Sequence, residues 1–524
     1  MREKKFNVRK REDSVDNDSV KNINNKQKEE NMKKKPNIVF FVPDSYRGDV
    51  LGHQGNEGAL TPNLDALVTS DAVSYSNAFS QNPVCTPSRC SFMTGWYPHV
   101  HGHRSMQNML KDHEPSILSV LRREGYFTWW GGKNDLNRVT EWSDYLKHCD
   151  IKFQPDGKYL DYMEYKNPQK IANDDPRKGV FYGGVCTRDG DGNQHWDRDT
   201  ACVLGAVDMI QNYSEDRPFF CYLPISKPHP AYYAEEDFYN AIDPDKLPPR
   251  IPTPSPEAKL PEVLKDLRLE YGSADISEEM WKDIKRVYYA MCSKVDDLFG
   301  KVIDALKEQG IYDDTWVFFF SDHGDFAGDY SLPEKTHSTL QDCLLHVPLI
   351  IKPPVNVPTK NGNREHLTEL LDITATLYDL LGIEPGYDHH GISLSTSLAG
   401  DETAIHDAVF AEVGSRKKEK GFINRIVEQL PKDNFYSHQG RVALPYHEAG
   451  SHAVMCRTQQ YKYIRRFYTG HHELFDLKKD PGEMQNESGN PEYTDIENQM
   501  EIRLLDFFMH TADILPHEKD SRGI

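Results

Sequence analysis

The sequence contains no run of the roughly 18 apolar residues that a membrane-crossing helix needs. Its first 35 residues also lack the apolar segment of a secretory signal. The nine cysteines are odd in number and form no C-x-x-C pair, which argues against a disulfide framework and against a structural zinc site. We therefore expect a cytoplasmic protein with reduced thiols and no membrane partner.

Positive charge is scarce, since 62 Lys and Arg stand against 82 Asp and Glu, for a net charge of -20. The backbone of a nucleic acid repels such a protein, so no nucleic-acid partner is expected. Residues 1–35 are the exception, with 12 Lys and Arg against 7 Asp and Glu. This stretch has almost no apolar residues and cannot form a core, so it is predicted to be a disordered basic extension.

Short apolar runs recur along the rest of the chain and are typical of strands buried on both faces of a parallel sheet. They lie at 37–42, 127–130, 218–223, 315–320 and 347–351. Helical patterns at 61–69, 114–124 and 278–308 alternate with them. Residues 36–400 are therefore predicted to form an α/β domain with a large, mixed, mostly parallel sheet between helices.

The character of the chain changes after about residue 400. Strand patterns at 452–457, 461–466 and 473–477 precede a helical pattern at 493–510. Residues 401–524 are expected to form a smaller C-terminal α+β subdomain with a short antiparallel sheet. Residues 230–275, rich in Pro, Asp and Glu, are expected to be a long surface excursion from the first domain.

Two of the predicted strands end in residues that could bind a metal. Asp44 follows the first, and Asp322 and His323 follow the run at 315–320. Carboxylates with one imidazole suit a divalent cation, and ligands gather at the carboxyl ends of strands in α/β sheets. A single Asp at such a place is normally a helix cap or turn residue, but two ends of this kind favour a site.

A cysteine stands at the predicted start of a short helix. Pro87 fits the first turn of that helix and Gly95 would end it. Cys85 then lies at the positive end of the helix dipole, with Arg89 one turn away to bind a tetrahedral oxyanion. An unpaired cysteine is most often simply buried, and that interpretation is kept for Cys90.

Cys85-Thr86-Pro87-Ser88-Arg89 resembles the C-x-P-S-R signature of the type I sulfatases in the alkaline phosphatase superfamily. Further segments similar to that family follow in its order, so the resemblance spans roughly residues 36–486. They are 36–47, Thr61-Pro62-Asn63-Leu64-Asp65, Thr94-Gly95-Trp96-Tyr97-Pro98, Gly131-Gly132-Lys133, Lys227-Pro228-His229-Pro230, Ser321-Asp322-His323-Gly324, Glu473-Leu474-Phe475-Asp476-Leu477 and Asp480-Pro481-Gly482-Glu483.

The resemblance implies an alkaline phosphatase-like fold and hydrolysis of a small-molecule or saccharide sulfate ester. It implies that a maturation enzyme oxidises Cys85 to formylglycine (3-oxoalanine), whose hydrate supplies the nucleophile. The metal, expected to be calcium, would be held by Asp44, Cys85, Asp322 and His323. Arg89 and Lys133 would bind the sulfate oxygens, and His229 could donate a proton to the leaving oxygen.

The sequence departs from the commonest family pattern at four positions. One is Asp322-His323, where many members have Asp-Asn, which is a known variation. Ser45 stands where a second acid usually follows Asp44, and Asp135 replaces a histidine assigned to sulfate expulsion. Asp135 could act as a base or merely pair with Lys133. Counting back from Val347, the distal lysine of the family falls on His337, which could act as a cation or proton donor if an anionic substrate raises its pKa.

These departures leave two alternatives to a sulfatase. The family's phosphonate monoester and phosphodiester hydrolases share the scaffold, and a silent metal-binding member would keep the fold without the reaction. The histidine cluster His99, His101 and His103 is expected to have a structural role. The walls of the substrate pocket are expected from 140–200, 230–275 and 415–450, where Tyr182, Arg188, His195, Trp196, Tyr232 and Tyr233 could line a sugar-sized cleft.

Overall fold

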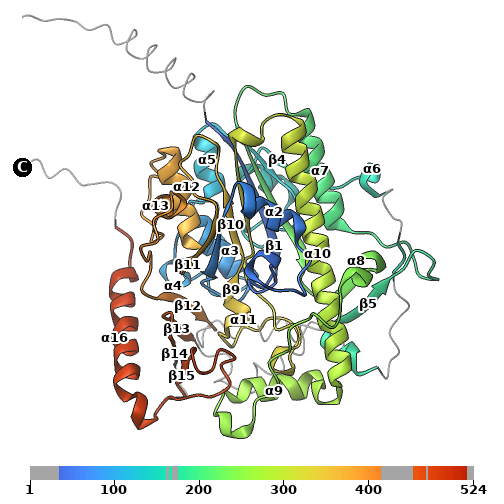
Figure 1. Cartoon of the computed structure of the whole chain (residues 1–524). Helices are drawn as coiled ribbons and strands as arrows, with labels where there is room; N and C mark the ends of the chain where they lie inside the picture. Colours follow the sequence, from blue (N-terminus) through green and yellow to red (C-terminus); the bar gives the residue numbers. More distant parts are fainter. Residues whose placement is uncertain (1–34, 161–164, 168–174, 415–451, 468–469, 516–524) are drawn as a thin grey trace, which may run out of the picture.

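The structure is a computed structural model that describes residues 35–160, 165–167, 175–414, 452–467 and 470–515 (Figure 1). The predicted basic extension therefore lies, apart from Lys35, outside the described residues, as does the expected pocket wall at 415–450. Within the described part of the chain, no helix is both long enough and apolar enough to cross a membrane.

A nine-stranded mixed sheet forms the centre of the larger domain. The strands β8, β1, β6, β3 and β4 run parallel, while β10 is antiparallel to both β8 and β2. Strand β9 (His346–Val347) pairs with β2 off this path. The strand order is β11 (Gly362–Glu369), β2 (Val73–Phe79), β10 (Leu349–Lys352), β8 (Thr315–Phe320), β1 (Asn37–Asp44), β6 (Phe219–Pro228), β3 (Phe127–Trp130) and β4 (Ile151–Lys152).

Helices cover both faces of this sheet. Successive side chains of a strand point to opposite faces, and both faces of β1 carry apolar side chains that pack against helices. Val39 and Phe41 of β1 pack with α2 (Pro62–Ser70), α7 (Arg198–Asn212) and α10 (Glu278–Glu308). Ile38, Phe40 and Val42 pack on the other face with α3 (Cys85–Thr94), α5 (Ile117–Arg123) and α12 (Leu371–Leu381). The α/β sandwich predicted from the alternating patterns is therefore confirmed (Figure 1).

A four-stranded antiparallel sheet follows at the C-terminal end, and α16 (Thr494–Thr511) lies along it (Figure 1). The predicted α+β character of this region is confirmed, while the boundary at residue 400 stays a prediction. The strands in order are β12 (Val409–Val413), β13 (Ala453–Arg457), β14 (Tyr461–Arg466) and β15 (Glu473–Asp476).

The segment 230–275 is not the plain surface excursion expected from its composition. It contains β7 (Tyr232–Glu235), α8 (Glu236–Ala241) and α9 (Glu262–Tyr271). Strand β7 pairs in parallel with β5 (Tyr182–Cys186), and Tyr232, Leu264 and Leu267 join the hydrophobic core. These few apolar side chains anchor a segment whose other residues are mostly polar.

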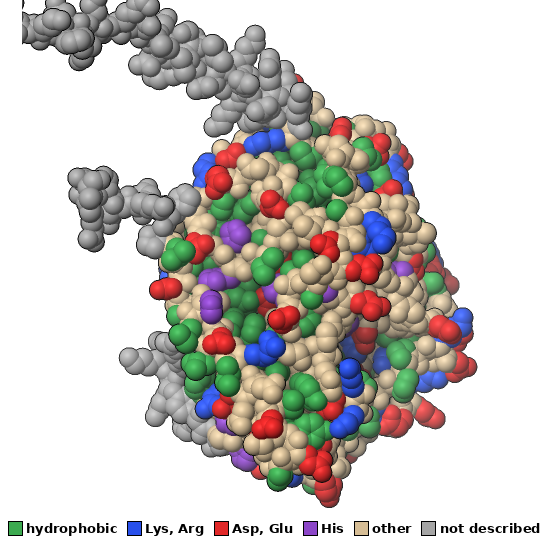
Figure 2. Space-filling model, turned by 60° about the vertical axis from the view of Figure 1, so that its left-hand side comes forward, with side chains coloured by type: hydrophobic (Ala, Val, Ile, Leu, Met, Phe, Trp, Pro, Cys, Tyr) green, Lys and Arg blue, Asp and Glu red, His purple; other side chains and the backbone are tan. Residues whose placement is uncertain are grey.

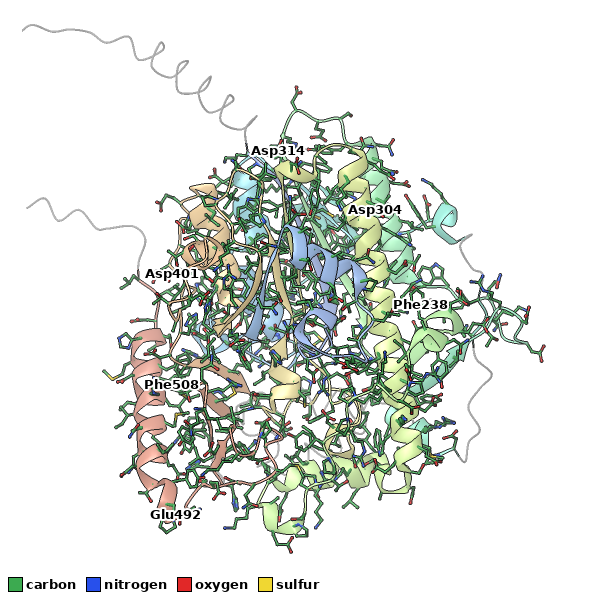
Figure 3. All side chains as sticks on the ribbon, in the orientation of Figure 1. Phe238, Asp304, Asp314, Asp401, Glu492 and Phe508 are labelled. Atoms are coloured by element: carbon green, nitrogen blue, oxygen red, sulfur yellow. The ribbon has the colours of Figure 1, made fainter. Side chains whose placement is uncertain are left out.

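The surface carries both signs of charge. Figure 2 shows acidic and basic side chains interspersed over one face, without a broad patch of a single sign. Asp304 on α10 and Asp314 ahead of β8 are exposed examples (Figure 3). The acidic side chains on the face shown in Figure 2 do not form one acidic groove.

Candidate active site

The site lies where β1 and β8 end. These strands are parallel neighbours, with Phe41 opposite Phe319, so their carboxyl ends meet at one edge of the sheet. Asp44 is the last residue of β1, and Asp322 and His323 follow β8 after one intervening residue, Ser321. The first turn of α3 faces the same edge, because Ser88 Oγ donates a 2.5 Å hydrogen bond to the carbonyl of Asp322.

Cys85 is the first residue of α3, as its sequence context predicts. The helix ends at Gly95, which takes a left-handed conformation with φ of 73°. Cys85 Sγ lies 3.2 Å from His323 Nε2 and 3.7 Å from Asp44 Oδ1. Burial, followed by the neighbouring charge of Asp44, raises the pKa of the Cys85 thiol well above its usual value.

Four side chains could hold a metal ion here. One ligand atom from each of Asp44, Cys85, Asp322 and His323 lies within 4.8 Å of the others, and all four residues are buried. His323 Nδ1 lies 2.8 Å from the carbonyl oxygen of Gly324. That oxygen can only accept, so Nδ1 carries the proton and the lone pair of Nε2 points into the cluster.

These residues fit a divalent cation. Two carboxylates and a neutral imidazole are oxygen and nitrogen donors of the kind such ions prefer. Asp322 Oδ2 is fully buried yet accepts no well-aligned hydrogen bond in the described part of the chain, although Arg89 Nη2 lies 2.8 Å away. A buried carboxylate oxygen with spare acceptor capacity is what a metal site requires.

Two cations flank the cluster. Arg89, fully buried, places Nη2 at 2.9 Å from Asp44 Oδ2, and Lys133 Nζ lies 2.6 Å from the same oxygen. Burial alone would raise the pKa of Asp44, but Lys133 and the neighbouring cations outweigh it and hold the pKa well below its usual range. The arrangement keeps Asp44 ionised, and Arg89 and Lys133 are placed to attract an anion.

Lys133 is positioned by a glycine. Gly132 has φ of 71°, and a Cβ atom there would lie 1.7 Å from the carbonyl oxygen of Pro224 on β6. The amide of Lys133 donates a 3.0 Å hydrogen bond to that same oxygen. Asp135, the predicted base or partner, places Oδ2 at 2.7 Å from Lys133 Nζ, so the ion pair is present and its role as a base stays a prediction.

Lys335 is a cation of the site that the sequence did not reveal. Its Nζ lies 2.5 Å from His229 Nε2 and 2.7 Å from Oε1 of the fully buried Glu334. His229 Nδ1 lies 2.6 Å from the carbonyl oxygen of Pro230, which accepts its proton, so Nε2 accepts from Lys335. In this arrangement the ammonium of Lys335 is the donor and His229 the acceptor of their shared hydrogen bond.

Burial, followed by repulsion from Lys335 and His323, lowers the pKa of His337 to about 4. From the sequence, a charge on His337 was expected only on condition that an anionic substrate raises its pKa. Lys335, two residues earlier, lies beside His229 instead. A direct catalytic part for His337 stays a prediction. The only sequence signal for Lys335 was its closeness to the counted position.

A family model described as Sulfatase matches residues 36–383. The chain belongs to the sulfatase family. A second family model, described as the C-terminal part of N-sulphoglucosamine sulphohydrolase, matches residues 424–509. An ulvan-active sulfatase of Formosa agariphila is 26% identical over 475 residues, which cover 90% of this chain and 80% of that protein.

Solved structures share the fold of this sulfatase. Phosphonate monoester hydrolase of Agrobacterium radiobacter has a TM-score of 0.71 at 22% identity, covering 91% of this chain and 96% of that one. A protein in complex with its substrate D-glucosamine-2-N,6-O-disulfate has a TM-score of 0.66 at 18% identity, covering 93% and 100%. The family model and the curated relative make the chain a sulfuric ester hydrolase.

The histidine cluster of the sulfatase is structural, as expected. His99 Nδ1 lies 2.5 Å from Glu412 of β12, which ties the region after α3 to the C-terminal sheet. His101 stacks on Trp96 with 4.1 Å between ring centroids, and His103 Nε2 lies 3.4 Å from Glu114. The metal-ligand cluster around Asp44 contains none of these three histidines.

Proposed function

We propose that this sulfatase cleaves sulfate monoesters with a formylglycine made from Cys85 and a calcium ion held by Asp44, Asp322, His323 and residue 85. One observation carries the proposal: Cys85 Sγ, at the start of α3, converges on three buried metal-ligand side chains within 4.8 Å. The sulfur marks where an oxygen of the aldehyde hydrate would stand.

Bound here, the cation would supply Lewis acidity, and the aldehyde hydrate would supply an oxygen nucleophile. Arg89 holds Asp44 and Asp322 in place through its guanidinium. Lys133 faces the same pocket and would neutralise the sulfate oxygens as charge develops on them. Lys335 would protonate the leaving oxygen, with His229 orienting its ammonium and contacting the ester. Asp135 would accept the proton during sulfate expulsion.

The substrate class is proposed to be saccharide sulfates. Two similar proteins support it, the ulvan-active sulfatase and the one bound to D-glucosamine-2-N,6-O-disulfate. Phosphonate monoester or phosphodiester hydrolysis is the second candidate, supported by the fold of a phosphonate monoester hydrolase and by Ser45, which leaves the site one carboxylate fewer. A formylglycine-generating enzyme is the partner that the proposal requires, and the cytoplasmic location stays a prediction.

Two measurements test the proposal. Mass spectrometry of the Cys85 peptide from the native host, or after co-expression with a maturation enzyme, should show a mass about 18 Da below that of the thiol. Cys90→Ala is the matched control, because Cys90 is a buried thiol outside the cluster. An unconverted peptide from the native host would favour the silent alternative.

Activity on 4-nitrophenyl sulfate and on a phenylphosphonate ester should then be compared in calcium and after chelation. We expect the sulfate ester to be preferred, and activity to disappear with EDTA and return with calcium. Cys85→Ala should abolish turnover, whereas Cys90→Ala should retain it. A preference for the phosphonate ester would establish the second candidate, and activity that survives chelation and dialysis would contradict the metal.

A further inference from the structure

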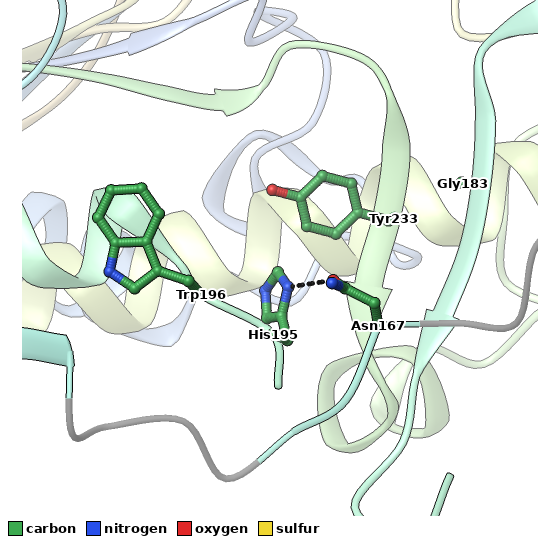
Figure 4. Close-up of a pocket in the computed structure, with 5 residues that line it drawn as sticks. All are labelled: Asn167, Gly183, His195, Trp196 and Tyr233. Carbon is green, nitrogen blue, oxygen red and sulfur yellow. Dashed lines mark hydrogen bonds between the residues drawn. The ribbon is translucent and has the colours of Figure 1, made fainter. Parts of the chain in front are cut away.

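A second concave site lies at the strand pair β5 and β7, which contribute Gly183 and Tyr233 to it. It is a cavity of about 330 Å³ lined by Asn167, Gly183, His195, Trp196 and Tyr233 (Figure 4). Its volume lies at the lower end of the range typical of small-molecule sites. The metal-ligand cluster contains none of these side chains, and the catalytic arrangement around Cys85 does not use them.

We propose that this cavity is a subsite for a pyranose ring of an oligosaccharide whose sulfate occupies the catalytic site. The inference rests on the proposed saccharide substrate. Trp196 lines the cavity and leaves 41% of its surface exposed, which is unusual for the largest aromatic side chain. Figure 4 shows the Tyr233 ring over His195 and the Trp196 indole on the side away from Asn167. Apolar ring faces next to polar groups match a sugar, which has C–H faces and hydroxyl edges.

The walls of the cavity are held rigidly. His195 Nδ1 lies 3.1 Å from Asn167 Oδ1, and its Nε2 lies 3.6 Å from Glu235 Oε1. Backbone hydrogen bonds of 2.7 Å join His195 to Tyr165 and Asn167 to Asn193. A site built before the ligand arrives spares the ordering cost of binding.

Glycines allow the segments around Asn167 and Gly192 to pack closely at the cavity. A Cβ at Gly192 would lie 1.9 Å from the carbonyl oxygen of Asn167, so only glycine permits this approach. A Cβ at Gly183 would lie 3.0 Å from Cβ of Tyr233 and would narrow the cavity. Tyr233 is itself fixed by Lys227, whose Nζ lies 4.3 Å from the ring centroid.

The cavity lies within reach of the reacting centre. His229 and Tyr233 are four residues apart, and four residues of fully extended chain span at most about 14 Å. Between them, Tyr232 accepts a 2.8 Å hydrogen bond from the amide of Glu334, next to Lys335. The backbone at Tyr233 is therefore within about 14 Å of the backbone at His229, a separation that an oligosaccharide can cover, as the proposed subsite requires.

A metal ion is the competing occupant, because His195, Asp197 and Glu235 have ligand atoms within 4.8 Å of one another. Lysine ammonium groups already pair with the carboxylates of this cluster. Lys227 Nζ lies 3.6 Å from Asp197 Oδ1, and Lys294 Nζ lies 3.8 Å from Glu235 Oε1. These two cations compensate the carboxylates and would repel a divalent ion, so a neutral ring is the better fit.

The test compares Trp196→Ala with Trp142→Ala, since Trp142 is also half exposed but lies outside the cavity. Both variants and the wild type are assayed in mature form on 4-nitrophenyl sulfate, which has no sugar ring to place in the cavity. They are also assayed on tetrasaccharides from heparin, chondroitin sulfate, carrageenan and ulvan. Trp196→Ala should lose about tenfold or more in kcat/KM on the preferred tetrasaccharide and stay within about twofold on the short ester. Trp142→Ala should change neither.

Calorimetric titration with the desulfated tetrasaccharides separates the subsite from the reaction. If the wild type binds a desulfated tetrasaccharide and Trp196→Ala does not, the subsite is supported. This result would stand even if the protein hydrolysed no sulfate ester, an outcome that would refute only the proposed function. An equal loss on long and short substrates would show a role in folding and overturn the subsite. The subsite would also be overturned if the wild type and Trp196→Ala bind and hydrolyse the tetrasaccharides equally well, or if neither protein binds them.

Discussion

Replacing Lys335 by methionine should separate its catalytic role from its structural one. The ammonium lies 2.5 Å from His229 Nε2 and 2.7 Å from Glu334 Oε1, and its side chain is 5% exposed. Lys335→Met leaves the fully buried Glu334 without this cation, which typically costs about 3–5 kcal/mol of stability. Losing a preorganised donor to the leaving oxygen typically costs about 10²–10³ in kcat.

The double variant Lys335→Met/Glu334→Gln removes the uncompensated charge. Its melting temperature should recover most of the loss seen in Lys335→Met, while kcat on 4-nitrophenyl sulfate should stay low. Lys301→Met, at an exposed ion pair with Asp297, is the matched control and should alter neither quantity. Recovery of kcat together with stability would mean that Lys335 serves only the fold.

His337→Gln completes the comparison. Counting along the sequence puts the distal cation at this position, but the lowered pKa of His337, about 4, leaves it neutral in the working range. We expect a loss of less than about tenfold in kcat/KM, well below that of Lys335→Met. If His337→Gln proves inactive while Lys335→Met turns over, the position derived from the count was right and the geometric assignment is refuted.

Two further perturbations test positioning and electrostatics. Gly132→Ala should displace Lys133, because its Cβ would lie 1.7 Å from the Pro224 carbonyl, and should reduce kcat/KM strongly. Gly310→Ala, also at positive φ but facing open space, should cost only about 1–2 kcal/mol in denaturant unfolding, and equal effects at both glycines would contradict the steric reasoning. Burial lowers the pKa of His406, but Asp372, 2.8 Å away, outweighs it and raises the pKa to about 9. Since the folded pKa is raised, this pair should contribute about 3 kcal/mol below pH 6.5 that is lost as the pH rises through 9, and His406→Gln should abolish that pH dependence.

The fold was most predictable where one signal was strong and local. The run at Thr315–Phe320 is apolar after its first residue and became β8 with those bounds, and the amphipathic pattern at Glu278–Glu308 became α10. Strands β2 and β11 were not singled out, because Ser, Asn, Arg and Glu interrupt their apolar residues. Their strand conformation depends on pairing with each other and with β10, which is a tertiary effect.

The site shows the same division. Asp44 is the last residue of β1, and Asp322 and His323 lie just beyond the end of β8, so their convergence follows from the parallel pairing of β1 with β8. Lys335 lies at the end of an irregular loop in which Ala327, Tyr330, Ser331 and Glu334 all have positive φ. Each such residue turns the chain in a way that sequence spacing does not reveal, so the position of Lys335 beside His229 could not be read from the sequence.

Contacts with neighbouring residues hold the backbone of that loop in its strained conformations. Asp329 pairs with Arg47 at 2.7 Å, and the amide of Glu334 donates to Tyr232, whose hydroxyl in turn donates to Asp325 at 2.6 Å. Left-handed backbone at a residue other than glycine costs on the order of 1–3 kcal/mol and persists only under such constraint. The strain therefore places Lys335 against His229 before substrate binds, so the ammonium needs no reorganisation when charge develops on the leaving oxygen.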